Sequence, residues 1–267
     1  MTQLAFTLKQ SLTQPLDCSQ LTPDHLKGLS IVQLSAIVLN KQLVSDIFEI
    51  TGDDTENIAF KNSNHLLDNI GKNMTFGSIT LDGDAGAYLG FGLKNGTIHC
   101  KGNVQAFAAC NMGSGLLKID GNTGDFLGGA SAGMGKGMRG GAVIVKGNAG
   151  DRVGDQMRRG LILIEGNAGD YCASRMIAGT IGVLGNIGSY AGFNMKRGTL
   201  LLTKLPNLHA TIQDCGFHSL PFLNLLFKSF AKFNTKFSGI ETRRIQRFVG
   251  DAACNGNGEI LLLLPST

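Results

Sequence analysis

The sequence predicts a mainly β protein, a right-handed parallel β-helix built from coils of 19 residues. Glycines recur at this spacing in two runs and open units of the form Gly–five residues–Gly–Asn/Asp. The first run is Gly77, Gly96 and Gly115, and the second is Gly141, Gly160, Gly179 and Gly198. The longer step between the runs falls in the Gly-rich segment 128–141, which we expect to leave the coil as an excursion.

Alternation inside each unit predicts one strand per coil. Two alternate positions are apolar in nearly every unit and are rich in β-branched residues, a pattern typical of strands. The first column holds Ile79, Ile98, Leu117, Val143, Ile162, Ile181 and Leu200. We expect it to line the interior, with an Asp/Asn column (Asp84, Asn103, Asn122, Asn148, Asn167, Asn186) hydrogen bonding at a corner. Aromatic and Met columns are interpreted as packing.

Composition divides the chain into three regions. Thirty of the 38 glycines lie between residues 77 and 198, and no proline lies between 24 and 205. We therefore expect a small N-terminal α/β cap over 1–76, the β-helix over 77–204, and a C-terminal helix and tail over 205–267. In the cap, Thr22 and Pro23 open a short helix, whereas 30–40 could be helix or strand.

In the C-terminal region, 205–217 looks like loop, 220–237 like an apolar helix, and 258–264 like a final strand. The helix could pack on the β-helix or bind a partner.

Catalytic and metal-binding patterns are absent from the sequence, so we assign no catalytic residue, no metal and no cofactor held in an active site of its own. The five histidines are scattered, and no HxH or HExxH pattern occurs. The Gly-rich segment fails as a nucleotide loop because Gly137 follows Lys136 where Ser or Thr is required. The six cysteines form no disulfide framework, and the opening residues MTQLAFTLKQ do not have the pattern of a signal peptide, so we expect free thiols and a cytoplasmic protein. No apolar run is long enough for a membrane, and nucleic acid is not expected.

Basic residues gather before the opening glycines of several coils. The net charge of the chain is +4, and residues 77–205 alone carry a balance of +5. Stacking would align these residues into a positive stripe, or leave them as a solvated face balanced by aspartates. The candidate stripe is Lys136, Arg139, Arg152, Arg158, Arg159, Lys196 and Arg197.

Outward strand positions change from polar in the early coils to apolar in the later ones. An apolar outer face implies a cover, either the C-terminal helix or another subunit. The candidate interface residues are Leu116, Ile144, Leu161, Leu163 and Leu201.

Together, the Gly–x5–Gly-(Asn/Asp) units, the segment GGASAGMGKGMRGG and the tail RRIQRFVGDAACNGNGEIL resemble the C subunit family of formylmethanofuran dehydrogenase. The opening LTPDHLKGL is most similar to the bacterial version, the C subunit of the formyltransferase/hydrolase complex of methylotrophs. A related GXGXG β-helix closes the large chain of glutamate synthase.

The resemblance implies a scaffold subunit without an active site, beside an A-type hydrolase, a D-type formyltransferase and a B-type subunit. Such a complex moves a formyl group from formyl-tetrahydromethanopterin to a methanofuran-type carrier and hydrolyses it to formate. The carrier has a polyglutamylated, anionic tail, which the stripe could hold because Arg grips carboxylates well. The alternatives are the C subunit of an archaeal molybdenum or tungsten dehydrogenase, an enzyme in its own right, and a glutamate-synthase-like structural domain.

Overall fold

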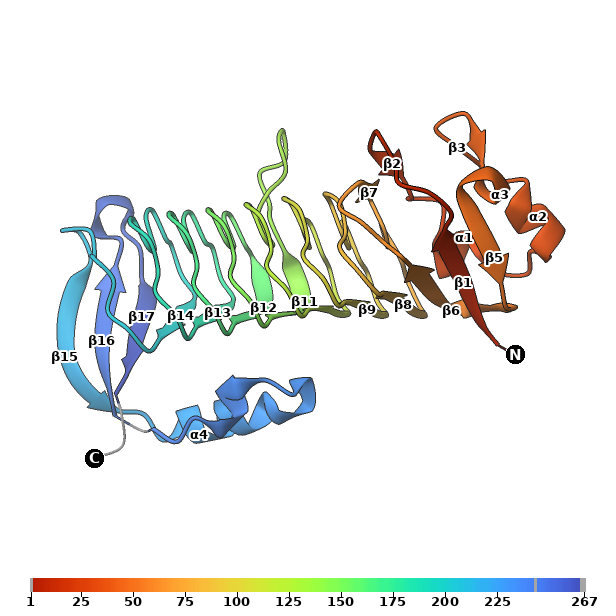
Figure 1. Cartoon of the computed structure of the whole chain (residues 1–267). Coiled ribbons are helices and arrows are strands. Elements are labelled where there is room, and N and C mark those ends of the chain that lie inside the picture. Colours follow the sequence, from red (N-terminus) through yellow and green to blue (C-terminus); the bar gives the residue numbers. More distant parts are fainter. Residues whose placement is uncertain (1, 243, 265–267) are drawn as a thin grey trace.

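The computed structural model describes residues 2–242 and 244–264 and forms one elongated body with its ends far apart (Figure 1). Met1, Arg243 and residues 265–267, which belong to the expected cap and tail, lie outside the described residues. Thirteen of the described strands form a single sheet that runs the whole length of the molecule. The prediction of a mainly β, β-helix-like fold is confirmed, because this one large, mostly parallel sheet dominates and helices are few.

The repeat region contributes one strand per unit to the sheet, and each pairs in parallel with the next along the chain. Residues 19 apart are register partners, as in Ile79 with Ile98, except where Leu117 pairs with Val143 across the longer step. These strands are β8 (Ser78–Leu81), β9 (Thr97–Cys100), β10 (Leu116–Ile119), β11 (Arg139–Val145), β12 (Arg159–Ile164), β13 (Thr180–Val183) and β14 (Thr199–Leu202).

The predicted apolar column lies in register and inside. From Ile79 to Leu200, each of its seven residues pairs with the next, and none is more than 1% exposed. Residues two apart in a strand point to the same face, so the second apolar column, from Leu81 to Leu202, is buried beside the first. The strand pattern of the sequence therefore fixes which side of the sheet holds the main core.

The predicted Asn ladder forms at the corner after the strands. Asp84 Oδ1 accepts hydrogen bonds from the backbone N–H of Asn103 (2.7 Å) and from its side-chain amide (3.2 Å). Asn103 accepts the same pair from Asn122, and the backbone bonds continue through Asn148 and Asn167 to Asn186. Each side chain thus satisfies a turn donor of the next unit, which sets the stacking distance.

The N-terminal region adds three strands to the same sheet, in the order β8-β6-β1-β5, so no break in the sheet falls at residue 76. The helix predicted at Thr22 and Pro23 is present as α1 (Pro23–Leu26). Residues 30–40, which could be helix or strand from the sequence, contain one of each. The helix α2 (Ile31–Ser35) begins with a capping box at Ser30, and the strand β3 follows it. The elements are β1 (Gln3–Leu8), β2 (Leu16–Asp17), β3 (Val38–Leu39), β4 (Gln42–Leu43), α3 (Val44–Ile47), β5 (Phe48–Thr51), β6 (Asp54–Lys61) and β7 (Leu67–Asp68).

At the other end, β17 (Gly258–Leu263) continues the parallel stack beside β14, and β16 (Arg244–Gly250) and β15 (Gln213–Ser219) then return antiparallel. The expected final strand is thus confirmed. The expected loop over 205–217 is wrong in its second half, because β15 begins at Gln213. Most of its residues are exposed, so the apolar alternation that reveals a strand is missing there.

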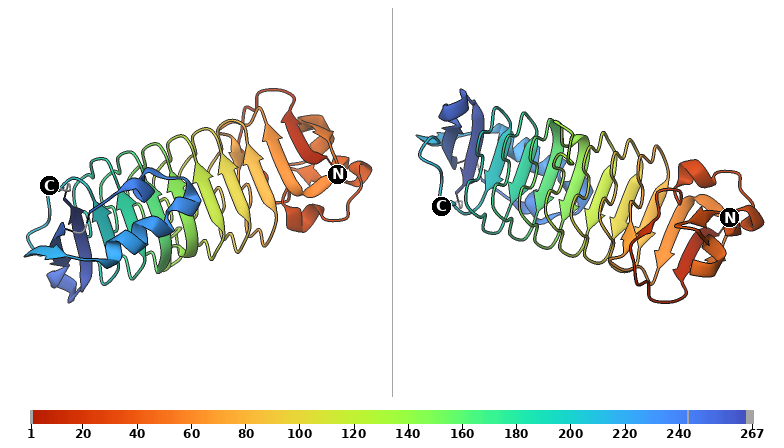
Figure 2. Two further views of the ribbon diagram at one scale, coloured as in Figure 1. Left: turned by 90° about the horizontal axis from the view of Figure 1, so that it is seen from below. Right: turned by 90° about the horizontal axis from the view of Figure 1, so that it is seen from above.

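A C-terminal segment crosses the outer face of the sheet (Figure 2). It comprises α4 (Phe222–Ser229) and the 3-10 turns η1 (Ala231–Phe233) and η2 (Lys236–Gly239), and a third turn, η3 (Ala252–Cys254), precedes β17. Leu223, Phe227, Phe230 and Phe237 pack on the outward residues of β11–β14 and form a second apolar core. The sheet is therefore covered on both faces over its later strands.

Candidate functional site

Three of the predicted basic residues form one exposed cluster at the start of two neighbouring strands. Arg139 opens β11 and is the register partner of Arg159, which opens β12, and Arg158 precedes it. All three side chains are exposed. Among residues 2–242 and 244–264, no carboxylate lies within ion-pair distance of them. Their positive charge is therefore free to attract an anion.

The remaining stripe residues do not join this cluster. In register, the next unit places Ile177 and Ala178 where Arg158 and Arg159 stand, so Lys196 and Arg197 lie two strands away. Two strand spacings amount to roughly 10 Å. Lys136 is exposed within the Gly-rich excursion that projects from the body in Figure 1. The structure therefore divides the predicted stripe into a cluster, a distant pair and a loop lysine.

Arg152 belongs to an aromatic ladder rather than to the cluster. Tyr88, Phe107 and Phe126 stack at 5.0 Å between ring centroids, and Tyr171 stacks on Tyr190 at 4.9 Å. Arg152 fills the gap between the two stacks, with its guanidinium 5.8 Å from the Phe126 ring and 4.7 Å from the Tyr171 ring. The 19-residue period places it in this column, a signal that the sequence interpretation missed.

The aspartates expected to balance the stripe serve the backbone instead. Asp125 Oδ1 accepts the backbone N–H of Asp151 at 2.8 Å, Asp151 that of Asp170 at 2.8 Å, and Asp170 that of Ser189 at 2.7 Å. These carboxylates form a second ladder that holds successive units together. They do not neutralise the arginine cluster.

Asp155 has a different partner, which sequence reasoning missed. Its carboxylate is almost fully buried and accepts hydrogen bonds from Ser174 Oγ (2.7 Å) and from Arg175 Nε (2.8 Å), and a second Arg175 nitrogen completes the ion pair. The hydrogen bond with Asp155 raises the pKa of Arg175, although desolvation opposes it. Ser174 follows Asp155 by one 19-residue step and Arg175 comes directly after it, so the period again held the signal. The bidentate pair makes Arg175 structural rather than free.

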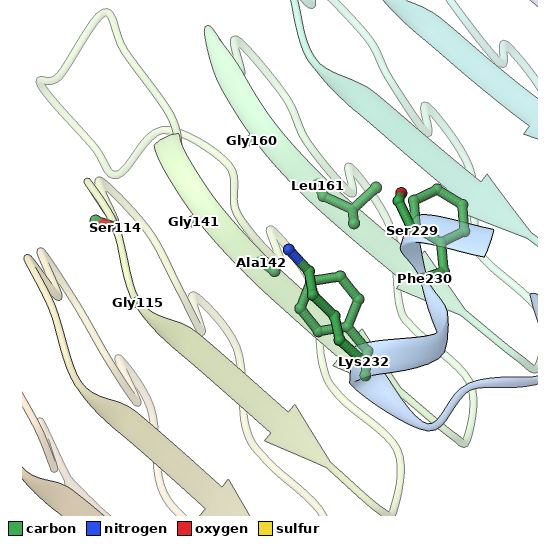
Figure 3. A pocket seen from close by; sticks show the side chains of 10 residues that line it. Ser114, Gly115, Gly141, Ala142, Gly160, Leu161, Ser229, Phe230 and Lys232 are labelled. Atoms are coloured by element: carbon green, nitrogen blue, oxygen red, sulfur yellow. The ribbon is translucent and has the colours of Figure 1, made fainter. Parts of the chain in front are cut away.

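A groove of about 390 Å³ lies beside the arginine cluster, between the sheet and the C-terminal segment (Figure 3). Its wall on the sheet side is mostly backbone, because glycines open the strands there. Lys232 lies on the opposite wall, and in Figure 3 its amine reaches over the sheet near Ala142. The lining is Ser114, Gly115, Gly141, Ala142, Gly160, Leu161, Ser229, Phe230, Lys232 and Phe233. Arg159 directly precedes Gly160, so the groove and the cluster share an edge.

The predicted apolar interface residues lie under the chain's own C-terminal segment. Ile144, Leu163 and Leu201 are buried in the second core, and Leu116 and Leu161 pack partly buried at its margin. The sequence left open whether the C-terminal helix or another subunit covers this apolar face, and in the structure the chain's own C-terminal segment covers it. A contact of these three buried side chains with another subunit would require the segment to leave.

A polar clamp fixes the segment to the sheet. The side chain of Glu165 is only 5% exposed. It accepts hydrogen bonds from Thr235 Oγ1 (3.0 Å) and from the Lys236 backbone (2.9 Å), and Lys236 Nζ lies 3.4 Å away.

Other titratable groups have structural explanations. Desolvation by burial raises the pKa of the Cys100, Cys110 and Cys172 thiols to about 12, so these thiols are not nucleophiles at neutral pH. In the part of the chain that the structure describes, no three His, Cys, Asp or Glu side chains gather as a metal site. Over the same residues, no helix is long and apolar enough to cross a membrane.

Comparison with solved structures matches the chain over its whole length. The crystal structure of the formyltransferase/hydrolase complex (FhcABCD) from Methylorubrum extorquens with methylofuran contains a chain that superposes with a TM-score of 0.90. The two sequences are 33% identical, and the match covers 98% of this chain and 100% of that chain.

Curated relatives indicate which subunit this is. Two sequences of the C subunit of tungsten-containing formylmethanofuran dehydrogenase 2, from Methanococcus maripaludis, are 32% and 31% identical over 95 and 96 residues. The chain belongs to the C subunit family of formylmethanofuran dehydrogenase. The aligned part spans 35% of each curated relative and about a third of this chain, 33% and 34%. No protein-family profile matches the chain. The chain therefore shares the fold of a subunit of the Methylorubrum complex over 98% of its length.

Proposed function

We propose that the chain is the non-catalytic scaffold subunit of a formyltransferase/hydrolase complex. The observation that carries the proposal is the end-to-end match, at 33% identity, to a chain of the Methylorubrum complex. The chain would support formyl transfer from formyl-tetrahydromethanopterin to a methanofuran-type carrier and hydrolysis to formate, in the cytoplasm. Its partners would be the A-type hydrolase, the B-type subunit and the D-type formyltransferase.

The architecture fits this role. The register of residues 19 apart supports a solenoid of 19-residue coils, which we propose to be right-handed. In this proposal 1–76 caps one end, and the C-terminal helix and tail over 205–267 pack on the solenoid. A stiff, elongated body with hydrogen-bonded corners can hold two active sites at a fixed separation. The assignment of a subunit interface remains a proposal, which requires displacement of α4 for Ile144, Leu163 and Leu201 and concerns accessible margin residues for Leu116 and Leu161.

The subunit would also hold the polyglutamylated tail of the carrier. The Methylorubrum complex was solved with methylofuran. Arg139, Arg158 and Arg159 lack carboxylate partners among the described residues and lie beside the groove that Lys232 enters. Unpaired guanidinium groups bind carboxylates in a bidentate way, and a chain of carboxylates could run along the groove edge. Lys136, Arg152, Lys196 and Arg197 are proposed as outer contacts.

The test is a triple variant, Arg139→Ser, Arg158→Ser and Arg159→Ser, purified within the whole complex. The expected result is loss of bound carrier and lower turnover, with the difference growing at low salt because salt screens exposed charges. The matched control removes the same amount of positive charge away from the cluster, by changing the exposed Lys41, Lys61 and Lys204 to Ser. Retained carrier with normal turnover in both variants would refute the tail site. Disassembly of the complex would assign the arginines to a contact between subunits instead.

A second candidate is the C subunit of an archaeal-type tungsten or molybdenum formylmethanofuran dehydrogenase, which the two Methanococcus relatives favour. Purifying the native complex and measuring its metal content would separate the two. A stoichiometric tungsten or molybdenum cofactor in the complex would replace the first proposal, whereas formyl transfer without one would support it.

A further inference from the structure

The C-terminal segment buries one side of α4 and exposes apolar residues on the other. Leu223 and Phe227 face the sheet and are buried. Phe222 is 51% exposed and Leu225 is 72% exposed. They are three residues apart, so they lie together on the outward face of the helix. A helix whose only task was to cover the sheet would carry polar residues at these outward positions.

The same surface carries positive charge without compensation on the segment. Residues 215–240 contain Lys228, Lys232 and Lys236 and no Asp or Glu. Lys236 pairs with Glu165, and Lys232 borders the groove. Lys228 follows Leu225 by three residues, is exposed, and has no carboxylate within ion-pair distance among residues 2–242 and 244–264.

A second exposed aromatic lies just before the helix. Phe217 on β15 is 60% exposed, and the guanidinium of Arg244 lies 5.2 Å from its ring. Phe217 on the edge strand and Phe222 at the start of α4 are thus two exposed aromatic side chains close in the chain, and Arg244 lies beside the Phe217 ring. Exposed aromatic and leucine side chains framed by basic residues are typical of protein interfaces rather than of solvated faces.

We infer that Phe222, Leu225 and Lys228 form the docking surface for another subunit, one that presents an apolar pocket bordered by carboxylates. The charge of the segment selects an acidic partner, because a second basic surface would be repelled. The two apolar side chains act as anchors, and Lys228 fixes the orientation. This inference rests on the proposed subunit role but concerns a different surface from the arginine cluster, and it leaves α4 in place on the sheet.

The test uses the chain produced together with the other subunits of its own complex. A zero-length carbodiimide reagent joins a lysine only to a carboxylate in direct contact, and peptide mass spectrometry locates the link. We expect Lys228 to be linked to an Asp or Glu of another subunit. A link from Lys228 to a second copy of this chain, or no link, would overturn the assignment of the partner.

Substitutions measure how much these side chains contribute to the stability of the complex. The double variant Phe222→Ser and Leu225→Ser should weaken assembly at least about tenfold, the effect of removing central apolar anchors. Lys228→Glu should also weaken assembly, and its effect should be larger at low salt than at high salt because salt screens exposed charges. The control double variant, Ile31→Ser and Val32→Ser, removes equally exposed apolar side chains from α2 and should assemble normally. Because all five side chains are exposed, thermal unfolding should match that of the wild type.

Normal assembly of both the double variant and Lys228→Glu would refute this surface and leave the scaffold role standing. Failure of the wild-type chain to join the complex would instead refute the scaffold role. Loss of assembly with Lys228→Glu but not with the apolar variant would overturn the inference, since the contact would then be electrostatic alone.

Discussion

The guanidinium of Arg152 lies 4.7 Å from the centroid of the Tyr171 ring, at a position where neighbouring units carry an aromatic ring. Its backbone shares the left-handed conformation of that column, with φ of 59° against 58° for Tyr171. A cation thus substitutes for a ring without breaking the stack, because an aromatic face attracts a guanidinium.

This relationship predicts opposite effects of two substitutions. Arg152→Ala should lower the free energy of unfolding by about 0.5–2 kcal/mol, the range of a partly desolvated cation–π contact. Arg152→Phe should keep the stability, since it restores a continuous stack. Thermal unfolding checks both, and equal stability of the Ala variant would contradict the stacking role. Carrier retention by the Phe variant then reports whether Arg152 also binds the carrier, because only its charge is lost.

The interior column predicts strong intolerance of charge at Ile162, which is fully buried between Val143 and Ile181. Ile162→Asp should abolish folding of the repeat region, because an unpaired carboxylate in an apolar core is very costly. Ile162→Val, the conservative control, should cost only about 0.5–1.5 kcal/mol. Circular dichroism and denaturant unfolding of the two purified variants check this. A soluble, folded Asp variant would contradict the burial of this column.

Replacement of Thr123 by an apolar residue should stabilise the protein. Its hydroxyl is buried and finds no hydrogen-bond partner among the described residues, in a bridge column that otherwise holds Ala, Val and Ile. An unsatisfied buried polar group costs about 1–3 kcal/mol, so Thr123→Val should raise the melting temperature. Thr123→Ser keeps the hydroxyl and serves as control. A Val variant less stable than wild type would show that the hydroxyl has a partner, such as an ordered water.

Loss of the Glu165 side chain should unfold the C-terminal segment locally and leave the rest of the protein folded. Glu165→Ala leaves the Thr235 hydroxyl and the Lys236 N–H without their acceptor, at a cost of about 1–3 kcal/mol. Hydrogen exchange should therefore accelerate over 222–240, whereas the strands beneath keep their protection. Asp170→Asn is a matched control in the same unit, because its amide oxygen still accepts the Ser189 N–H. Unchanged exchange in the segment would show that the apolar contacts alone hold it.

Asp120 predicts a dependence of stability on pH. Burial raises the pKa of its carboxyl, but hydrogen bonds from Lys146 (2.7 Å) and His99 (2.9 Å) prevail and hold the pKa below its ordinary 3.8. The lowered folded-state pKa stabilises the protein above the unfolded value, and this contribution is lost as pH falls through the folded pKa.

The comparison is between wild type and Asp120→Asn in denaturant unfolding. Wild type should be more stable at pH 7 by about 1 kcal/mol, a value discounted for partial exposure. The advantage should begin to shrink near pH 5 and should vanish in strong acid. A constant difference across that range would contradict the titration of Asp120, and Lys101→Met at the exposed Asp82 pair is the control for a general charge effect.

The sequence by itself determined the repeating body. The interior columns, the strand register and the Asn ladder all follow from contacts between residues one unit apart, so a local pattern with a fixed period carries the information. The Arg152 and Asp155–Arg175 positions were available from the same period. They were missed because one unlike residue in an aromatic column, and a buried acid paired one repeat later, do not show as apolar alternation.

Only the tertiary structure decided what covers the outer face and whether the aspartates balance the arginine cluster. The chain reverses after β14, and the C-terminal segment comes to lie on β11–β14, where Leu223 of α4 and Phe237 of η2 share the second core with Leu163 (Figure 2). No period relates these residues, and burial of Leu163 by α4 or by another subunit leaves the same apolar signal in the sequence. The unpaired state of the arginine cluster likewise depends on the tertiary structure, because Asp125, Asp151 and Asp170 accept backbone N–H groups of the next unit and do not pair with the arginines.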